Sequence, residues 1–351
     1  MPTDPQSILI VRLSAIGDVI FSTSLLPGLR QRYPEAKIIW LAEALGAEVL
    51  GDHPLLDDVW VLPRRRWVKE WKAGRKGAVL REVMEWRKKL RAERFDLAID
   101  MQGLLKSGIC AWLSGAPRRV SLEGREGSRW LMHETVHDPE SQGGRICRDY
   151  FVLSQYLGLP EEVFGMSLHP EATKVEAARK KIAEADPGRL PVFLFPFTTR
   201  PQKHWFDERW AELANVIYRQ GSYSVWILGG PGDTAQAEAI AAQANIPINL
   251  VVGPQTDLQE KLALVSQAHA CVGVDTGLTH MSYGLHRPTV ALFGSTCPYL
   301  ETDPVPGVVL YDDLDCAPCH RHPTCAGRFT CMRNHSVERV YAALKPFLTT
   351  R

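Results

Sequence analysis

Short apolar runs alternate with amphipathic stretches along the whole chain. An apolar run bounded by turn residues predicts a buried strand, whereas apolar positions three or four residues apart predict a helix. In the first half the pattern predicts strands at residues 8–13, 37–41, 58–62 and 95–100, with helices at 18–33 and 77–94. In the second half it predicts strands at 192–195, 224–228, 249–252, 269–274 and 289–293, with helices at 173–185, 208–220, 234–243, 258–267 and 336–348. This alternation is typical of α/β folds with parallel sheets.

The strand candidates form two series, which indicates two domains. A length of 351 residues agrees with about two domains of ordinary size. The polar segment 186–191 lies between the series and has the composition of a linker. We expect two Rossmann-like, doubly wound parallel-sheet domains, over residues 1–170 and 171–351, that face each other across a cleft.

The composition narrows the function classes. Apolar residues make up 45% of the chain and charged residues 23%, which is typical of a globular protein with buried cores. No apolar run approaches the roughly 18–20 residues of a membrane span, and residues 1–7 lack the features of a secretory signal. We therefore expect a cytoplasmic protein without a transmembrane segment. The net charge of +1 and the lack of a recognisable RNA or DNA module argue against nucleic acid as a partner.

Ligands bind open α/β sheets at the carboxyl ends of the strands, so the loops that follow strands are the candidate sites. In the first loop, Arg12-Leu-Ser-Ala-Ile-Gly-Asp-Val, Gly17 allows a sharp turn and Asp18 falls in the first turn of the next helix. The helix dipole favours a carboxylate there even without a ligand. The loop contains neither a dinucleotide-binding glycine fingerprint nor a P-loop.

The first two loops of the second half carry groups that suit a nucleotide. Thr198, Thr199 and Lys203 follow the strand at 192–195 and offer hydroxyls and a cation beside aromatic residues. A solvated loop lysine would give the same pattern. The loop at 229–233, Gly-Gly-Pro-Gly-Asp, permits close approach of a ligand to the backbone, but a tight turn would select the same glycines.

The loop after the strand at 269–274 is a candidate phosphate site. Asp275, Thr276 and Gly277 lead into a helix whose first N–H groups could receive a phosphate, with Asp275 available for a hydroxyl. His280 falls about one turn further along and faces either the ligand or the core.

A basic segment is concealed by the balanced overall charge. Residues 64–94 contain 13 Lys or Arg and 4 Asp or Glu, a local excess of +9. Its start, Arg64-Arg-Arg-Trp-Val-Lys-Glu-Trp-Lys, precedes any clear helix and alternates arginines with tryptophans, which suits anionic sugars, lipid phosphates or a membrane surface. Residues 87–94 interleave acids at helical spacings, as a solvated helix face does.

Four of the eight cysteines crowd into one short segment, at Cys316, Cys319, Cys325 and Cys331, with His320 and His322 among them. Four thiolates could form a tetrahedral structural zinc site. The spacing differs from that of common paired zinc knuckles, so reduced packing thiols and a local disulfide remain alternatives. The cluster follows the last predicted strand, which indicates a structural role under each interpretation.

Five segments in one order carry a resemblance. They are residues 8–19, the basic segment 63–71, Ile99-Asp-Met-Gln-Gly-Leu-Leu-Lys-Ser, Thr198-Thr-Arg-Pro-Gln-Lys-His-Trp and Asp275-Thr-Gly-Leu-Thr-His. Together they resemble the bacterial lipopolysaccharide heptosyltransferases of glycosyltransferase family 9, over nearly the whole chain, and imply the GT-B architecture of two facing Rossmann-like domains. The third and fifth segments are most similar to members that add the first heptose to Kdo–lipid A. Those members lack the cysteine cluster, which other members carry.

The resemblance implies roles at the matching positions. It assigns Asp18 as catalytic base and Lys203 as the partner of the donor diphosphate. The residues that it places around the ADP-heptose donor are Thr198, Thr199, Lys203, Asp275, Thr276, Gly277 and His280. The residues that suit the anionic acceptor are Arg64, Arg65, Arg66, Lys69 and Arg125. A donor-site acid that the family places after Gly229 and Gly230 has no direct counterpart, although Asp233 and Glu238 lie nearby.

The implied reaction is an inverting transfer of heptose from ADP-L-glycero-D-manno-heptose without a metal ion. Asp18 would take the proton of the attacking hydroxyl, while Lys203 and the helix that begins at residues 276–277 would stabilise the departing diphosphate. The D-x-D sequence at 313–315 lies late in the chain, so we interpret it as surface acids. No cofactor is then required for catalysis, and a structural zinc is the one metal considered.

The acceptor implied by the resemblance is a lipid, so we expect a cytoplasmic protein that is peripheral at the inner face of the inner membrane. Two alternatives stay open at this stage. One is a family relative with another heptose acceptor or another sugar donor. The other is a catalytically idle protein that binds a nucleotide sugar or an anionic lipid.

Overall fold

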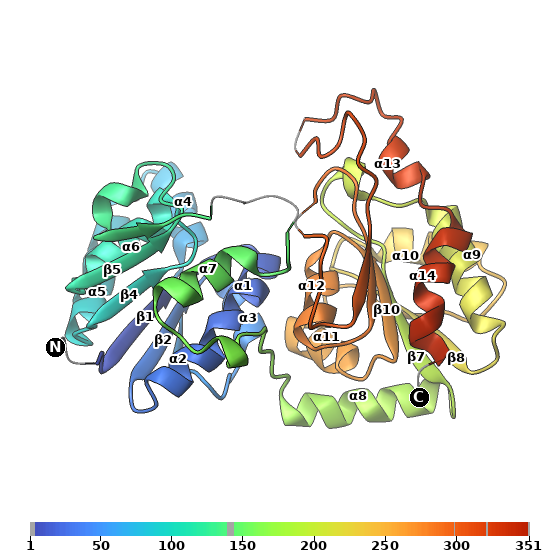
Figure 1. Ribbon diagram of the computed structural model, residues 1–351, viewed down its shortest axis with the longest axis horizontal. Coiled ribbons are helices and arrows are strands. Elements are labelled where there is room, and N and C mark those ends of the chain that lie inside the picture. Colours follow the sequence, from blue (N-terminus) through green and yellow to red (C-terminus); the bar gives the residue numbers. More distant parts are fainter. Residues whose placement is uncertain (1–3, 139–143, 298, 321, 350–351) are drawn as a thin grey trace. The chain divides into compact units, whose positions relative to one another are not determined.

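In the residues that the structure describes, each half of the chain is built on one six-stranded parallel sheet (Figure 1). The computed structural model describes residues 4–138, 144–297, 299–320 and 322–349. These separate into two compact units, one of residues 4–138 and 147–169 and the other of residues 144–146 and 170–349. The predicted α/β class with two parallel, Rossmann-like sheets is confirmed.

The first unit contains the sheet β3-β2-β1-β4-β5-β6. Its strands are β1 (Ser7–Val11), β2 (Lys37–Ala42), β3 (Asp58–Val61), β4 (Leu97–Asp100), β5 (Arg118–Leu122) and β6 (Glu134–Val136). Its α-helices are α1 (Ile16–Ser22), α2 (Leu26–Arg32), α3 (Ala44–Leu50), α4 (Arg64–Lys72), α5 (Lys76–Ala92), α6 (Leu105–Ser114) and α7 (Arg148–Tyr156). Its 3₁₀-helices are η1 (Thr23–Leu25), η2 (Ser128–Leu131) and η3 (Glu161–Val163).

Strand β1 shows why the first unit has helices on both faces of its sheet. All five of its residues are buried, and successive side chains of a strand point to opposite faces. Ile8 and Ile10 accordingly join a core with α1, α2, α3 and α7, whereas Leu9 and Val11 join a second core with α5 and α6. The continuous apolar run that predicted this strand therefore serves two cores at once.

The second unit contains the sheet β12-β11-β10-β7-β8-β9. Its strands are β7 (Leu190–Phe195), β8 (Tyr223–Leu228), β9 (Asn249–Val251), β10 (Ala270–Val274), β11 (Thr289–Leu292) and β12 (Gly307–Leu310). Its helices are α8 (Ala172–Ala185), η4 (Pro201–Lys203), α9 (Asp207–Tyr218), α10 (Thr234–Gln243), α11 (Leu258–Val265), α12 (Gly277–Gly284), α13 (Thr330–Arg333) and α14 (Val337–Thr349).

The two sheets have the same topology. If the strands of the second unit are counted from β7, its order is 3-2-1-4-5-6, which is also the order of the first unit. In each sheet the chain reverses its direction of winding between the first and fourth strands, β1 with β4 and β7 with β10. Loops at such a switch point leave a crevice at the strand ends where α/β proteins bind ligands.

The structure corrects three predictions from the sequence. Residues 64–72 form helix α4, although their composition indicated no clear helix. The polar segment 186–191, expected to be a linker, lies inside the second unit, where β7 begins at Leu190. The helix expected at 18–33 consists of α1, η1 and α2 in succession, since the 3₁₀ turn interrupts the regular α-helix.

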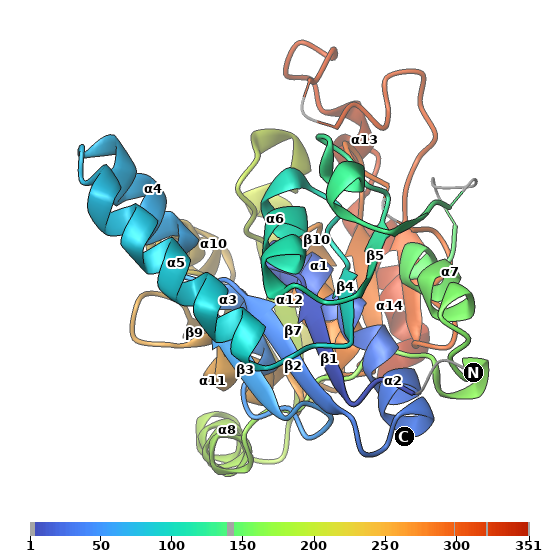
Figure 2. The ribbon, with the colours of Figure 1, turned by 90° about the vertical axis from the view of Figure 1, so that its left-hand side faces the viewer.

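The three strands that the pattern missed are short or polar. Strand β5 begins with two arginines, β6 has three residues and β12 is an edge strand with no fully buried position. Helix α4 packs against α5, and the two form a helical hairpin that can be followed in Figure 2. Trp67 of α4 and Trp86 of α5 make an edge-to-face contact. Such contacts depend on tertiary structure, which periodicity alone does not reveal.

Candidate active site

Asp18 lies at the switch point of the first sheet, in the first turn of α1. Its Oδ2 pairs with Nη2 of Arg12 at 2.7 Å and accepts a hydrogen bond from the backbone N–H of Ala15 at 3.2 Å. The Asp18 side chain is 48% exposed. Both contacts involve one oxygen, and within the described residues Oδ1 has no such partner. The carboxylate is thus oriented through Oδ2 and can accept a proton at Oδ1.

Arg12 connects Asp18 to the sheet. It follows β1, is buried, and donates from Nη1 to the carbonyl of Met101 at 2.5 Å, directly after β4. Burial opposes the charge of Arg12, but Tyr150, Asp18 and Asp100 outweigh it and raise the pKa of the guanidinium above its ordinary value. Arg12 therefore stays charged and ties Asp18 to both strands of the switch point.

The turn after β4 is anchored by a second carboxylate. Asp100 is fully buried and accepts hydrogen bonds from the N–H groups of Gln102 and Gly103 and from Oγ of Ser107, at 3.0–3.1 Å. Burial raises the pKa of Asp100 in spite of these bonds. Gln102 in turn accepts from the backbone N–H of Leu13 at 3.2 Å, in the loop that carries Asp18. Asp100 thus fixes the turn that contains Gln102, and Gln102 in turn holds the loop that carries Asp18.

Lys106 is a polar residue at the Asp18 edge of the sheet to which the sequence pattern assigned no role. Its Nζ donates to Oγ of Ser14 at 3.1 Å. Burial and the positive charges of Arg64 and Arg12 lower the pKa of Lys106. Its place on α6, one turn after a strand end, was the signal that could have identified it.

The predicted acceptor residues on α4 have different ion-pair partners. Arg64 and Arg65 both pair with the buried carboxylate of Glu43, at 2.5 Å and 3.2 Å, whereas Arg66 pairs with Glu82 of α5 at 2.5 Å. Because of the Arg64 pair, the start of α4 lies beside the Asp18 edge of the sheet. Lys69, on the next turn of α4, influences Glu70 electrostatically.

Arg125 lies in the loop after β5, and its side chain is 66% exposed. It contacts Glu123 at 3.5 Å, and its backbone N–H donates to the carbonyl of Gly103 at 2.6 Å. That backbone bond places Arg125 next to the Gln102 turn, although its side chain remains open to solvent.

Asp275 is the centre of a buried polar group in the second unit. It follows β10, its side chain is 13% exposed, and its Oδ2 pairs with Nζ of Lys203 at 2.5 Å. Its Oδ1 lies 3.2 Å from Nε2 of His280, and the hydroxyl of Thr296 donates to Oδ2. The structure therefore brings together side chains that follow three neighbouring strands, β7, β10 and β11.

The charges around Asp275 outweigh its burial. Burial by itself would raise the pKa of this carboxyl, but the hydrogen bond and charge of His280 and the charge of Lys203 hold the pKa well below its usual range. Asp275 is therefore ionised at neutral pH, and any anion that binds Lys203 shares this cation with Asp275.

The start of α12 has the form of an anion site. The first N–H groups of any helix lack intrahelical partners. Here Thr276 is the N-cap, has extended backbone and makes no capping bond with its side chain. Thr198 lies beside it and donates to the carbonyl of Asp275 at 3.4 Å. Thr199, the next residue, is exposed.

A side chain could not replace Gly273 in β10, because its Cβ would lie 2.1 Å from Oγ1 of Thr279.

His280 is a member of the Asp275 group and not a residue of the apolar core. It is 6% exposed, and its Nδ1 lies 3.4 Å from the hydroxyl of the buried Tyr299. Sequence reasoning missed Thr296 and Tyr299. They follow β11, so the rule that searches strand ends could have identified Thr296 if it had been applied to that strand.

The loop at 229–233 forms a tight turn. Asp233 accepts a hydrogen bond from the backbone N–H of Gly230 at 2.6 Å, and a Cβ at Gly229 would lie 2.6 Å from the ring of Phe197. The contact with Phe197 accounts for Gly229 through packing.

The cysteine segment does not assemble a metal site in this structure. The eight cysteines are free thiols, and in the described parts of the chain no three His, Cys, Asp or Glu side chains are arranged to hold a metal ion. Burial and neighbouring thiols raise the pKa values of Cys319 and Cys331. The zinc interpretation therefore stays a prediction, which metal analysis of purified protein would test, and we derive no step through a metal. Asp313 and Asp315 are both exposed.

Comparison with known proteins decides the family. The family profile described as glycosyltransferase family 9 (heptosyltransferase) matches residues 83–326. Lipopolysaccharide heptosyltransferase 1 of Pseudomonas aeruginosa is 32% identical in an alignment of 326 positions, which covers 89% of this chain and 85% of that protein. The chain belongs to glycosyltransferase family 9. It is therefore a glycosyltransferase, as the resemblance implied.

Solved structures of this family have the same fold. A family 9 glycosyltransferase from Veillonella parvula superposes with a TM-score of 0.84 at 20% identity, over 99% of this chain and 98% of that one. An Escherichia coli heptosyltransferase with ADP-2-deoxy-2-fluoro heptose gives a TM-score of 0.70 at 24% identity, over 97% and 99% of the two chains. The family 9 fold accounts for both six-stranded sheets. Among the described residues, no helix has the length and apolar character to cross a membrane.

Proposed function

We propose that this family 9 enzyme transfers heptose from ADP-L-glycero-D-manno-heptose to the Kdo–lipid A inner core of lipopolysaccharide, with inversion and without a metal ion. The similarity to lipopolysaccharide heptosyltransferase 1 of Pseudomonas aeruginosa, at 32% identity, supports heptose transfer within the lipopolysaccharide core. A heptosyltransferase of similar fold was solved with an ADP-heptose analogue, which supports the nucleotide of the donor.

The observation that carries the proposal is the state of Asp18. An inverting transfer requires a base that removes the proton of the acceptor hydroxyl while this oxygen attacks the anomeric carbon from the face opposite the leaving group. Asp18 is exposed, is oriented by Arg12 through Oδ2, and keeps Oδ1 clear of protein partners within the described residues. It can therefore receive a proton from a bound hydroxyl without losing the ion pair.

The group around Asp275 suits the donor. The bond between the anomeric carbon and the diphosphate oxygen breaks as the new glycosidic bond forms, so negative charge accumulates on the departing ADP. Lys203 and the first N–H groups of α12 can stabilise this charge, since both are fixed at the edge of the sheet before reaction. Thr198 and Thr199 would contact the phosphates, and Asp275 with His280 would lie near the sugar.

The acceptor side is basic. Arg64, Arg65, Arg66, Lys69 and Arg125 would contact the carboxylates and phosphates of Kdo–lipid A. Lys106, which lies next to Ser14 in the Asp18 loop, adds a further cation at the same edge. A lipid acceptor also implies that the enzyme works in the cytoplasm as a peripheral protein of the inner membrane.

A transfer assay with purified protein tests the proposal. We expect ADP and heptosylated Kdo–lipid A to appear in equal amounts from ADP-heptose, at the same rate with and without EDTA. Asp18→Ala should abolish transfer, whereas Asp52→Ala, at an exposed aspartate of the same unit, should not. Transfer that survives Asp18→Ala would contradict the base, and loss of activity in EDTA would contradict the metal-free mechanism. Transfer from a different nucleotide sugar, or to a different core acceptor, would replace the substrates while keeping the family chemistry.

A further inference from the structure

Large apolar side chains are exposed over the helical layer formed by α5, α6 and η2. We call this surface the outer helical face and define it by Leu80, Met84, Leu105, Ile109, Trp112 and Trp130. Their exposed fractions run from 40% at Ile109 to 79% at Trp130. Single exposed apolar residues are common, but a gathering of this size on neighbouring elements indicates a surface that contacts something apolar.

The spacing along each helix shows that these residues form a face. Leu105, Ile109 and Trp112 are separated by four and three residues on α6, and Leu80 and Met84 by four on α5, so each set lies on one side of its helix. The opposite sides are buried, with Leu90 of α5 and Cys110 and Ala111 of α6 in the same core. The apolar content of both helices therefore exceeds what the core uses.

The exposed sides of α5, α6 and η2 belong to one helical layer of the first unit. α5 packs against α6, and α6 packs against η2. All three elements cover the face of the sheet that carries Leu9 and Val11. The exposed side chains of neighbouring elements in one layer thus face outward together.

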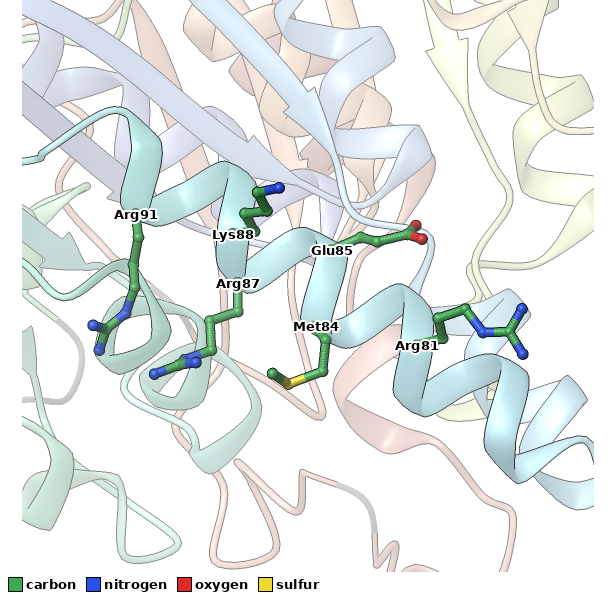
Figure 3. Close-up of a pocket in the computed structure, with 6 residues that line it drawn as sticks. All are labelled: Arg81, Met84, Glu85, Arg87, Lys88 and Arg91. Carbon is green, nitrogen blue, oxygen red and sulfur yellow. The ribbon is translucent and has the colours of Figure 1, made fainter.

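Basic side chains border the apolar ones. A surface hollow of about 460 Å³ along α5 is lined by Arg81, Met84, Glu85, Arg87, Lys88 and Arg91 (Figure 3). Figure 3 shows Met84, Arg87 and Arg91 pointing to the same side of the helix. Within the described residues these arginines and Lys88 form no ion pair, in contrast to Arg64, Arg65 and Arg66, which are all paired. Arg87 and Arg91 are therefore cations of the basic segment that lie beside Met84 on the outer helical face without an acidic partner among the described residues.

We propose that the outer helical face docks on an anionic lipid bilayer, with its apolar side chains among the headgroups and Arg87 and Arg91 on lipid phosphates. A helix with exposed apolar residues, tryptophans and basic neighbours has the composition of an interfacial element. The guanidinium groups require counter-charges, and anionic headgroups supply them across the whole face. The inference rests on the proposed function only in that the acceptor is itself an anionic lipid.

Vesicle sedimentation tests the surface. We expect the protein to sediment with phosphatidylcholine vesicles that contain about a third phosphatidylglycerol and to stay in solution with phosphatidylcholine alone. The variant Ile109→Glu/Trp112→Glu should weaken the partition at least about tenfold. Leu190→Glu/Leu300→Glu, at equally exposed apolar positions of the second unit, should bind as the wild type does. Equal loss in both variants would overturn the docking surface.

The cations are tested by neutralisation. Arg87→Gln/Arg91→Gln should lower partition into the anionic vesicles roughly thirtyfold, since each contact near the surface contributes separately. Arg219→Gln/Lys345→Gln removes the same charge from exposed positions of the second unit and should have little effect. Equal effects of the two variants would show a general charge effect and would contradict this face.

An activity assay separates the docking from the catalysis. All these variants should fold, as circular dichroism and thermal unfolding would show, and should transfer heptose to a lipid-free Kdo acceptor at the wild-type rate. The two variants of the outer helical face should lose activity only with Kdo–lipid A in vesicles, whereas the two control variants should keep the wild-type activity with both acceptors. If the wild type transfers to neither acceptor but still binds anionic vesicles, the proposed function fails and the docking stands. If the wild type ignores vesicles and Ile109→Glu/Trp112→Glu converts a dimer to a monomer, the face joins two copies of this chain and the docking is wrong.

Discussion

The two switch points of this protein have the same topology, but their carboxylates differ in exposure and in the number of their partners. In the first unit, a half-exposed carboxylate has one cation and one backbone N–H as partners. In the second unit, a buried carboxylate is held by Lys203, His280 and Thr296. One sheet topology thus presents either an accessible carboxylate or a rigid group of compensated charges, and the loop residues decide which. This difference agrees with the proposed function, in which Asp18 would receive a proton from the substrate and the group around Asp275 would stabilise a leaving group.

The largest expected effect that tests this comparison is on Asp18. Asp18→Asn keeps the size of the side chain but removes its basicity, so we expect kcat to fall about 10²–10⁴-fold. The free energy of unfolding should fall by about 1 kcal/mol, less than for Asp275→Asn, because the buried Arg12 keeps its hydrogen bond to Met101 and the nearby charge of Asp100. Steady-state kinetics and urea unfolding measure the two quantities, with Asp52→Asn as the matched control. A large loss of stability would show that Asp18 is structural and would remove the contrast.

Asp275→Asn should affect stability as well as activity. The substitution leaves Lys203 buried without its counter-charge, so we expect the free energy of unfolding of the second unit to fall by about 3 kcal/mol. Asp315→Asn changes an exposed aspartate of the same unit and should leave unfolding and transfer unaltered. If Asp275→Asn were as stable as the wild type, the group would be no more structural than Asp18, and the two switch points would not differ in the way described.

Thr296→Val should have a smaller effect of the same kind. It removes one hydrogen bond to an ionised carboxylate but leaves both cations, so we expect a loss of about 1.5 kcal/mol in urea unfolding. Thr173→Val, on the exposed face of α8, provides the control. A loss no larger than that of the control would show that Lys203 and His280 hold Asp275 without help from Thr296.

The smallest effect is in acid. The pKa of Asp275 is depressed in the folded protein, so its contribution to stability is fully present above the unfolded value of about 3.9 and is lost as the pH falls towards the folded value. Unfolding measured between neutral pH and pH values below about 4 should therefore show a steeper acid loss in the wild type than in Asp275→Asn. Parallel pH profiles would contradict the depressed pKa.

The sequence predicted the central strands of both sheets because each is a continuous apolar run between turn residues. It did not predict β5, since the two arginines at its start disguise a strand whose last three residues are buried. It located Asp18, Lys203, Asp275 and His280 through their places after strands and a family resemblance. Their grouping around Asp275 depends on neighbours in the sheet, β7, β10 and β11, which are far apart in the chain.

The basic segment shows a different limit of sequence reasoning. It contains 13 cations and 4 acids, and the sequence predicts an anionic ligand for the arginines at its start, which stays a prediction. The structure pairs those arginines with Glu43 and Glu82, and Glu43 precedes the segment by about twenty residues. A charge count along the chain cannot identify which cations have partners supplied by the fold.

The link from Arg12 to Met101 and Asp18 has a consequence for how the first unit moves. One guanidinium bonds both to a carbonyl after β4 and to the carboxylate in the loop after β1. The loop is therefore tied to two central strands, which restricts the orientations that are open to Asp18. Such preorganisation reduces the rearrangement needed when charge develops in the transition state. With Asp18 as the proposed base, we expect replacement of Arg12 to slow the chemical step through the lost orientation of Asp18.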